Sequence, residues 1–174
     1  MTGREQGLRS GLRAAAKIGC AVLTAGVLGV SVVALGQDQS AATAKDAIFA
    51  RKILMDTIGH NTDELETMVE TGKIDLAEGT EHADNVSVML MAFPHLFPPS
   101  SNQWKPNLER DPGTDTFAAP EVWTRFSDFY LQASNASKLA YKVSRADSEA
   151  EFKTLFGELR ESCNACHAAF LKTE

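Results

Sequence analysis

Two cysteines and a histidine lie close together near the end of the chain, in the segment Cys163-Asn164-Ala165-Cys166-His167. On a helix the cysteines and the histidine occupy positions i, i+3 and i+4, so their side chains leave the same face. Two thiols at this spacing can add across the two vinyl groups of a porphyrin, and the adjacent imidazole can bind its iron. The C-x-x-C-H pattern therefore predicts one covalently bound haem c, with Cys163 and Cys166 as its anchors and His167 as an axial ligand of the iron.

Two other uses of paired cysteines fit the chain less well. A thioredoxin-like redox pair lies next to a βαβ pattern, and the sequence shows no such pattern. A zinc site needs a second pair of ligands at comparable spacing, whereas the third cysteine, Cys20, is alone in an apolar N-terminal run. The motif therefore favours haem over a redox pair or a zinc site.

The first 36 residues have the composition of an export signal. They begin with a basic leader that contains Arg4, Arg9, Arg13 and Lys17. Residues 18–36 carry no charge and end with small residues at both cleavage-determining positions, which predicts a signal peptide cleaved near Gly36. The alternative is an uncleaved anchor in the inner membrane, because residues 18–36 are close to the shortest length that spans a bilayer. In either case residues 37–174 form an exported domain, and we expect it in the periplasm.

The exported domain is acidic. The whole chain has 17 Lys plus Arg and 23 Asp plus Glu, and residues 1–36 contain four of the basic residues and one of the acidic residues. Residues 37–174 therefore have 13 basic and 22 acidic residues, a net charge of −9. Such a surface disfavours nucleic acid as a partner and favours redox partner proteins with a basic docking face. A membrane is expected as a partner only if the N-terminal segment is retained.

Helical periodicity dominates the rest of the chain. Apolar residues that recur every three or four positions predict four helices. They run from about Thr43 to Glu70 with a stop at Thr71-Gly72-Lys73, from Asp75 to Pro94, from Pro120 to about Ser144, and from a cap at Asp147 or Ser148 through the haem motif. The segment between Pro94 and Ala119 is rich in Pro, Asn and Asp, which predicts a long non-helical loop that wraps a core or covers a ligand. The other connections are short, so we predict an all-α fold, an antiparallel four-helix bundle.

Two predicted core stripes bear on the haem. In the third helix the stripe includes Val122, Phe126 and Phe129. In the fourth helix it includes Cys163 and Cys166, so the haem is expected to replace side chains in the interior of the bundle.

A C-x-x-C-H motif near the C-terminus of a four-helix domain resembles the cytochrome c prime family, the class II cytochromes c. The likeness extends from about Thr43 to the end of the chain. It includes three weaker motifs in the expected order: Arg51-Lys52-Ile53-Leu54-Met55, Leu96-Phe97-Pro98 and Pro120-Glu121-Val122-Trp123. The resemblance implies a four-helix bundle, one covalent haem c and His167 as the proximal ligand. Family members often dimerise through their first two helices, so a homodimer is a further expectation.

The resemblance also implies roles for two residues of the first helix. In the family, the residue on the other side of the haem lies four positions after an arginine, and here that residue is Met55 after Arg51. A Met at this position is similar to the low-spin branch, in which the thioether binds the iron, whereas a Leu or Phe accompanies five-coordinate iron. Arg51 is similar to the residue that contacts a haem propionate. The family often has another arginine four positions after the haem histidine, but this chain has Leu171 there and Lys172 one step later.

Three functions are compared on this basis. We expect an electron carrier with His167 and Met55 as iron ligands, because a thioether is a soft ligand and His/Met ligation raises the reduction potential. The alternative is a five-coordinate protein that binds nitric oxide or carbon monoxide, with Met55 acting only as a core residue. A haem peroxidase, with Arg51 as its distal residue, is least favoured because Met55 would block the iron. The protein is therefore not expected to be an enzyme.

Overall fold

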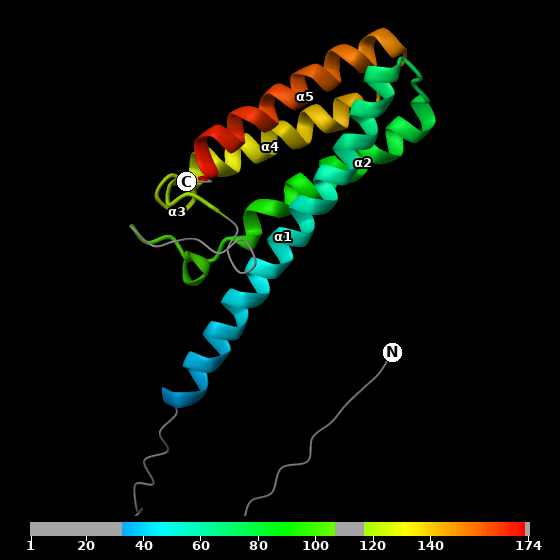
Figure 1. Ribbon diagram of the computed structural model, residues 1–174. Helices are drawn as coiled ribbons and strands as arrows, with labels where there is room; N and C mark the ends of the chain where they lie inside the picture. Colours follow the sequence, from blue (N-terminus) through cyan, green and yellow to red (C-terminus); the bar gives the residue numbers. More distant parts are fainter. Residues whose placement is uncertain (1–32, 107–116, 173–174) are drawn as a thin grey trace, which may run out of the picture. The chain divides into compact units, whose positions relative to one another are not determined.

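The computed structural model describes residues 33–106 and 117–172, with side chains described from residue 43 onward. The described residues form helices α1 Val33–Thr71, α2 Leu76–Ala92, α3 Glu121–Thr124, α4 Phe126–Val143 and α5 Glu149–Phe170, and two 3₁₀ helices, η1 Phe93–Leu96 and η2 Pro99–Ser101. The four long helices α1, α2, α4 and α5 make up a bundle (Figure 1). The predicted all-α four-helix fold is confirmed.

Helix α1 is longer than predicted. It begins at Val33, about ten residues before the expected start at Thr43, and its first turns project beyond the other helices (Figure 1). The added segment is rich in Ala and Gln, which favour helix. The predicted signal peptide, residues 1–36, lies outside the described residues except for its last four, so its cleavage stays a prediction. Within the part of the chain that the structure describes, no helix has the length and apolar character needed to cross a membrane.

Three predicted helix ends are confirmed by their local geometry. After α1, Gly72 has a φ of +67°, a left-handed conformation that glycine adopts easily and that ends many helices. At the start of α2, the Asp75 carboxylate accepts hydrogen bonds from two backbone N–H groups of the first turn, at 2.9 and 3.2 Å. At the start of α5, the backbone N–H of Glu151 donates to the Ser148 hydroxyl at 3.3 Å. These capping residues determine where the helices begin and end.

The third predicted helix is interrupted. Arg125 has φ −127° and ψ 43°, which separates the short α3 from α4, so the prediction of one continuous helix is wrong at this point. A non-helical residue changes the rotational phase of the side chains that follow it. Phe126 is therefore 41% exposed instead of lying in the predicted core stripe, while Val122 and Phe129 on either side remain buried.

The chain between α2 and α3 contains more regular structure than predicted. The 3₁₀ helix η1, which contains Pro94, follows α2 directly, and η2 begins at Pro99, so the segment starts with two tight turns. At its other end, the Ala119 N–H donates to the carbonyl of Phe170, and the Lys172 N–H donates to the carbonyl of Phe117, both at 2.8 Å. This short antiparallel pairing ties the loop to the end of α5.

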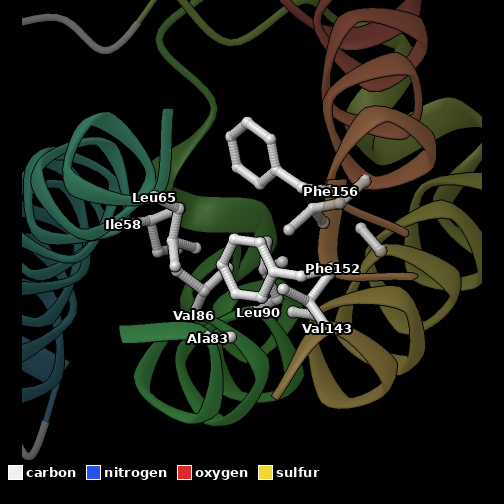
Figure 2. Packing of buried hydrophobic residues seen from close by; sticks show 11 residues of the cluster. Ile58, Leu65, Ala83, Val86, Leu90, Val143, Phe152 and Phe156 are labelled. Atoms are coloured by element: carbon white, nitrogen blue, oxygen red, sulfur yellow. The ribbon is translucent and has the colours of Figure 1, made fainter. Parts of the chain in front are cut away.

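The main core lies between α1, α2, α4 and α5. Its buried members are Ile58, Leu65, Ala83, Val86, Leu90, Ala136, Ala140, Val143, Phe152, Phe156 and Leu159. Figure 2 shows the Phe152 ring among side chains of α1 and α2. The ring lies so close to α2 that a Cβ added to Gly79 would be 2.7 Å from it. Glycine at this position therefore permits the close approach of α2 and α5.

A second, aromatic cluster lies beside the end of α5 that carries the haem motif. It consists of Phe93, Phe97, Ala118, Val122, Phe129 and Phe170. Its rings meet edge to face, with centroid distances of 4.9 Å for Phe97 and Phe129 and 5.3 Å for Phe129 and Phe170. The aromatic cluster and the main core share half-buried neighbours from α1, Leu54 and Met55.

Candidate haem site

A cavity of about 270 Å³ lies between α1, the aromatic cluster and the end of α5. Met55, Cys166 and His167 border it together with aromatic side chains. A second cavity, of about 80 Å³, shares these three residues and adds Cys163 and Arg160. Helix α1 contacts α5 far less than it contacts α2, and α5 contacts α1 far less than it contacts α4. The two cavities therefore occupy the part of the bundle where its wall is most open.

The structure brings the three residues of the motif to this open part. Cys163 and Cys166 are half-buried on the last turns of α5, and His167, at the next position, is exposed. The carbonyl of His167 accepts the N–H of Leu171 at 2.9 Å, which closes the final turn of the helix. The helical spacing predicted from the sequence is therefore present, and all three side chains border a cavity.

The thiols of the motif are in an environment that keeps them protonated. Burial raises the pKa of Cys166 to about 11, with a further contribution from nearby Cys163. Burial also raises the pKa of Cys163, although the positive charge of Arg160 acts in the opposite direction. Redox-active C-x-x-C pairs depend on a lowered thiol pKa, because the thiolate is the nucleophile. These shifts argue against a thioredoxin-like use of the pair.

The surroundings of His167 favour its neutral form. Burial lowers the pKa of the imidazole, and the positive charge of Arg160 lowers it further. A metal binds the neutral form of histidine, because a protonated ring nitrogen has no free electron pair. The direction of the shift therefore suits an iron ligand.

Met55 lies across the cavities from the motif. Its side chain is half-buried, borders both cavities and packs against both the main core and the aromatic cluster. The sequence predicted that Met55 faces the haem, and the structure places it on the same cavities as Cys166 and His167. Whether its sulfur binds iron stays a prediction.

Arg51 is one turn before Met55 and is only 2% exposed. Its guanidinium donates to the Ser101 hydroxyl at 2.8 Å and to the Ser101 carbonyl at 3.2 Å, and it lies 4.6 Å from the centre of the Phe97 ring. Arg51 also borders the larger cavity. A buried, oriented cation at this place suits a carboxylate of the haem, and the propionate contact stays a prediction.

Lys172 has other contacts. Its ammonium pairs with the Glu121 carboxylate at 3.3 Å and lies 5.9 Å from the centre of the Trp104 ring. Leu171, by contrast, borders the larger cavity. The position at which the family often has its second arginine therefore presents an apolar side chain to the cavity.

Arg160 and Phe117 are among the cavity residues that were not singled out from the sequence. Arg160 borders the smaller cavity, and its position three residues before Cys163 and seven before His167 was a usable signal. Phe117 borders the larger cavity and has a φ of +54°, which is unusual for a residue other than glycine. No local pattern in the sequence indicated that Phe117 would reach this place.

A sequence model of the family described as Cytochrome C' matches residues 46–171, which is more than half of the chain. The chain belongs to the cytochrome c prime family. Members of this family are non-enzymatic haem proteins that bind one covalent haem c, and this chain has the cysteine pair of that attachment. The expected family and cofactor are thereby confirmed. No curated protein sequence matches the chain significantly.

Solved cytochromes c prime share the fold. The protein from Shewanella frigidimarina is 22% identical, with 74% of this chain and 96% of that chain covered and a TM-score of 0.63. The protein from Thermochromatium tepidum is 17% identical, with 74% and 95% covered and a TM-score of 0.64. A nitric oxide complex of a variant from Alcaligenes xylosoxidans is 19% identical, with 75% and 97% covered and a TM-score of 0.62. At these identities the likeness concerns the fold.

The residues at the site fit a haem c. The two thiols and the imidazole have the spacing of covalent attachment, the adjoining cavity is mostly apolar, and a buried arginine borders it. These features match the needs of a flat apolar macrocycle with two carboxylates and an iron.

Proposed function

We propose that this protein is a periplasmic haem c protein whose iron is held by His167 and binds nitric oxide or carbon monoxide on the side facing Met55. The observation that carries the proposal is the apolar cavity bordered by both Met55 and His167. The polarity and access of the distal pocket decide whether a haem protein binds a gas or transfers electrons, and an apolar pocket suits small uncharged ligands. Cytochrome c prime variants from Alcaligenes xylosoxidans with bound nitric oxide have the same fold, which supports the proposal.

Each site residue has a distinct part in this proposal. Cys163 and Cys166 anchor the porphyrin through thioether bonds, and His167 binds the iron from the end of α5. Arg51, oriented by Ser101, holds a propionate. Bound haem supplies the iron to which a diatomic gas attaches. Arg51 is buried and bonded to η2, so it is poorly placed for the acid–base role that a peroxidase requires.

A second candidate function is electron transfer with His167 and Met55 as the two iron ligands. The position of Met55 on the same cavities as Cys166 and His167 favours it. His/Met ligation raises the reduction potential and leaves no iron position for a gas. The acidic surface would then suit a redox partner with a basic docking face. The sequence favoured this function, whereas the nitric oxide complexes of the related fold favour gas binding.

Titration of the purified, reduced protein with nitric oxide and carbon monoxide tests the proposal. Acid-acetone treatment should first leave the chromophore on the protein, because thioether bonds survive it. We then expect stoichiometric spectral changes with either gas in the wild type and in Met55→Leu, which keeps the side-chain volume without the sulfur. If the wild-type spectrum does not change with either gas while that of Met55→Leu does, the result would instead favour the electron-transfer function. An extractable chromophore would contradict both functions.

A homodimer is part of the proposal. Cytochrome c prime homologues form dimers, and one solved member shows a ligand-controlled dimer dissociation. Sedimentation of the mature protein should give the mass of two chains. A single-chain mass at every concentration up to the millimolar range would contradict this expectation.

A further inference from the structure

Arg160 brings a positive charge to the wall of the site. It lies seven residues before His167, which places the two side chains about 20° apart around α5 and roughly 10 Å apart along its axis. It borders the smaller cavity together with Met55, Cys163, Cys166 and His167. The predicted haem anchors and iron ligands therefore all lie near one guanidinium.

The position of Arg160 is maintained from the opposite helix. Its guanidinium pairs with the Glu66 carboxylate of α1 at 3.4 Å, and the two side chains are 37% and 36% exposed. Glu66 does not border either of the two cavities. The positive member of the pair is thus on the haem side and the negative member is farther away, so the pair presents a net positive field to the site.

We propose that Arg160 raises the reduction potential of the haem iron and that Glu66 moderates this effect. Reduction adds one electron to ferric iron and gives ferrous iron, which lowers the positive charge at the site by one. A fixed cation in the wall of the cavity favours the ferrous state. The proposal rests on the proposed attachment of haem to Cys163 and Cys166 and on iron ligation by His167. It holds for either a gas-binding or an electron-carrying protein.

Potentiometric titration of Arg160→Gln and Glu66→Gln tests this inference, with electrons supplied by an electrode through soluble mediators. Arg160→Gln should lower the ferrous-to-ferric ratio at a fixed potential by roughly two- to tenfold, and tenfold corresponds to about 59 mV. Glu66→Gln should raise this ratio by a smaller factor, and Arg160→Lys should remain close to the wild type. The opposite signs separate an electrostatic role from a structural one, because both Gln variants break the same ion pair.

The outcomes distinguish this inference from the proposed function. Covalent haem with an unchanged potential in Arg160→Gln would overturn the inference and leave the function intact. Shifts of the same sign in both Gln variants would also overturn it, because loss of the ion pair would then explain them. A wild-type protein without covalent haem would overturn the proposed function itself. If Arg160→Gln does not fold, the sign of the shift in Glu66→Gln still decides, and a downward shift contradicts the inference.

Discussion

The main core is built by the four long helices, whereas the aromatic cluster joins α4 and α5 to η1 and α3, and the two regions are packed in different ways. In the main core, Phe152 lies so close to α2 that a Cβ added to Gly79 would be 2.7 Å from its ring. In the aromatic cluster, rings from η1, α4 and α5 meet edge to face and border a cavity of about 270 Å³. The main core is closed by its own side chains except where Ile58, Leu90 and Ala136 border the smaller cavity, and the aromatic cluster is arranged around space for a further group.

This difference indicates how the bundle divides its tasks. Close packing without voids supplies most of the stability of a small domain, so the main core should hold the helices together. Aromatic rings in edge-to-face contact can border a flat apolar group without collapsing onto it. The C-x-x-C-H motif lies at the end of α5 that adjoins the aromatic cluster, where the side chains of the chain leave room.

The largest expected effect is the loss of a ring from the main core. Phe152→Ala should lower the free energy of unfolding by about 3–5 kcal/mol, because it removes a fully buried side chain and leaves a cavity. The same exchange at Phe126, which is 41% exposed, should cost about 1 kcal/mol or less. Urea denaturation followed by far-UV circular dichroism measures both. Equal losses would mean that the main core does not dominate stability.

The second prediction concerns the polar contact that supports the aromatic cluster. Arg51→Lys should lower the free energy of unfolding by about 1.5–3 kcal/mol, because a single ammonium cannot reproduce the hydrogen bonds to both oxygens of Ser101. The matched control is Arg125→Lys, an exposed arginine paired with Asp128, which should cost at most about 1 kcal/mol. The same denaturation experiment compares the variants. An Arg51→Lys protein as stable as the control would exclude Arg51 as a structural link to η2.

The third prediction tests the close approach in the main core. Gly79→Ala should cost about 1–3 kcal/mol, because the added methyl group would lie 2.7 Å from the Phe152 ring. Gly157→Ala, at an exposed helical position with nothing within 4 Å, should instead stabilise the protein by up to about 1 kcal/mol. Thermal unfolding midpoints give the sign of each change. A stabilised Gly79→Ala protein would show that the main core is looser than described.

The smallest expected effect is a pH dependence beside the aromatic cluster. The pKa of Glu121 is held below its ordinary value of 4.5 by a hydrogen bond from its own backbone and by the ion pair with Lys172. A lowered carboxyl pKa contributes stability above the unfolded pKa, and this contribution is lost as the pH falls through the lower folded value. Urea midpoints of the wild type should therefore fall more steeply below pH 4.5 than those of Glu121→Gln. Parallel curves would show that the ion pair contributes nothing.

Local sequence patterns predicted the parts of the fold that depend on neighbouring residues. The caps Asp75 and Ser148 and the stop at Gly72 follow from short-range hydrogen bonding and backbone conformation. The placement of Cys166 and His167 on one cavity follows from helical geometry. These features need no knowledge of distant parts of the chain.

Features set by distant contacts were not predictable in the same way. The apolar spacing around Phe126 was correct for a continuous helix, and only the break at Arg125 turned this ring toward solvent. The pairing of Glu66 with Arg160 joins residues on different helices, which periodicity cannot match to each other. Met55 borders the same cavity as Cys166 and His167, but whether its sulfur binds iron depends on sulfur–iron geometry that a sequence pattern does not contain.

The spin state of the ferric protein tests the account most directly. We predict that the electron paramagnetic resonance spectrum of the purified wild type is high-spin and that Met55→Leu gives the same signal, because His167 is the only protein ligand in the proposed gas-binding function. A low-spin wild type that becomes high-spin in Met55→Leu would contradict this function and show that the Met55 thioether binds the iron.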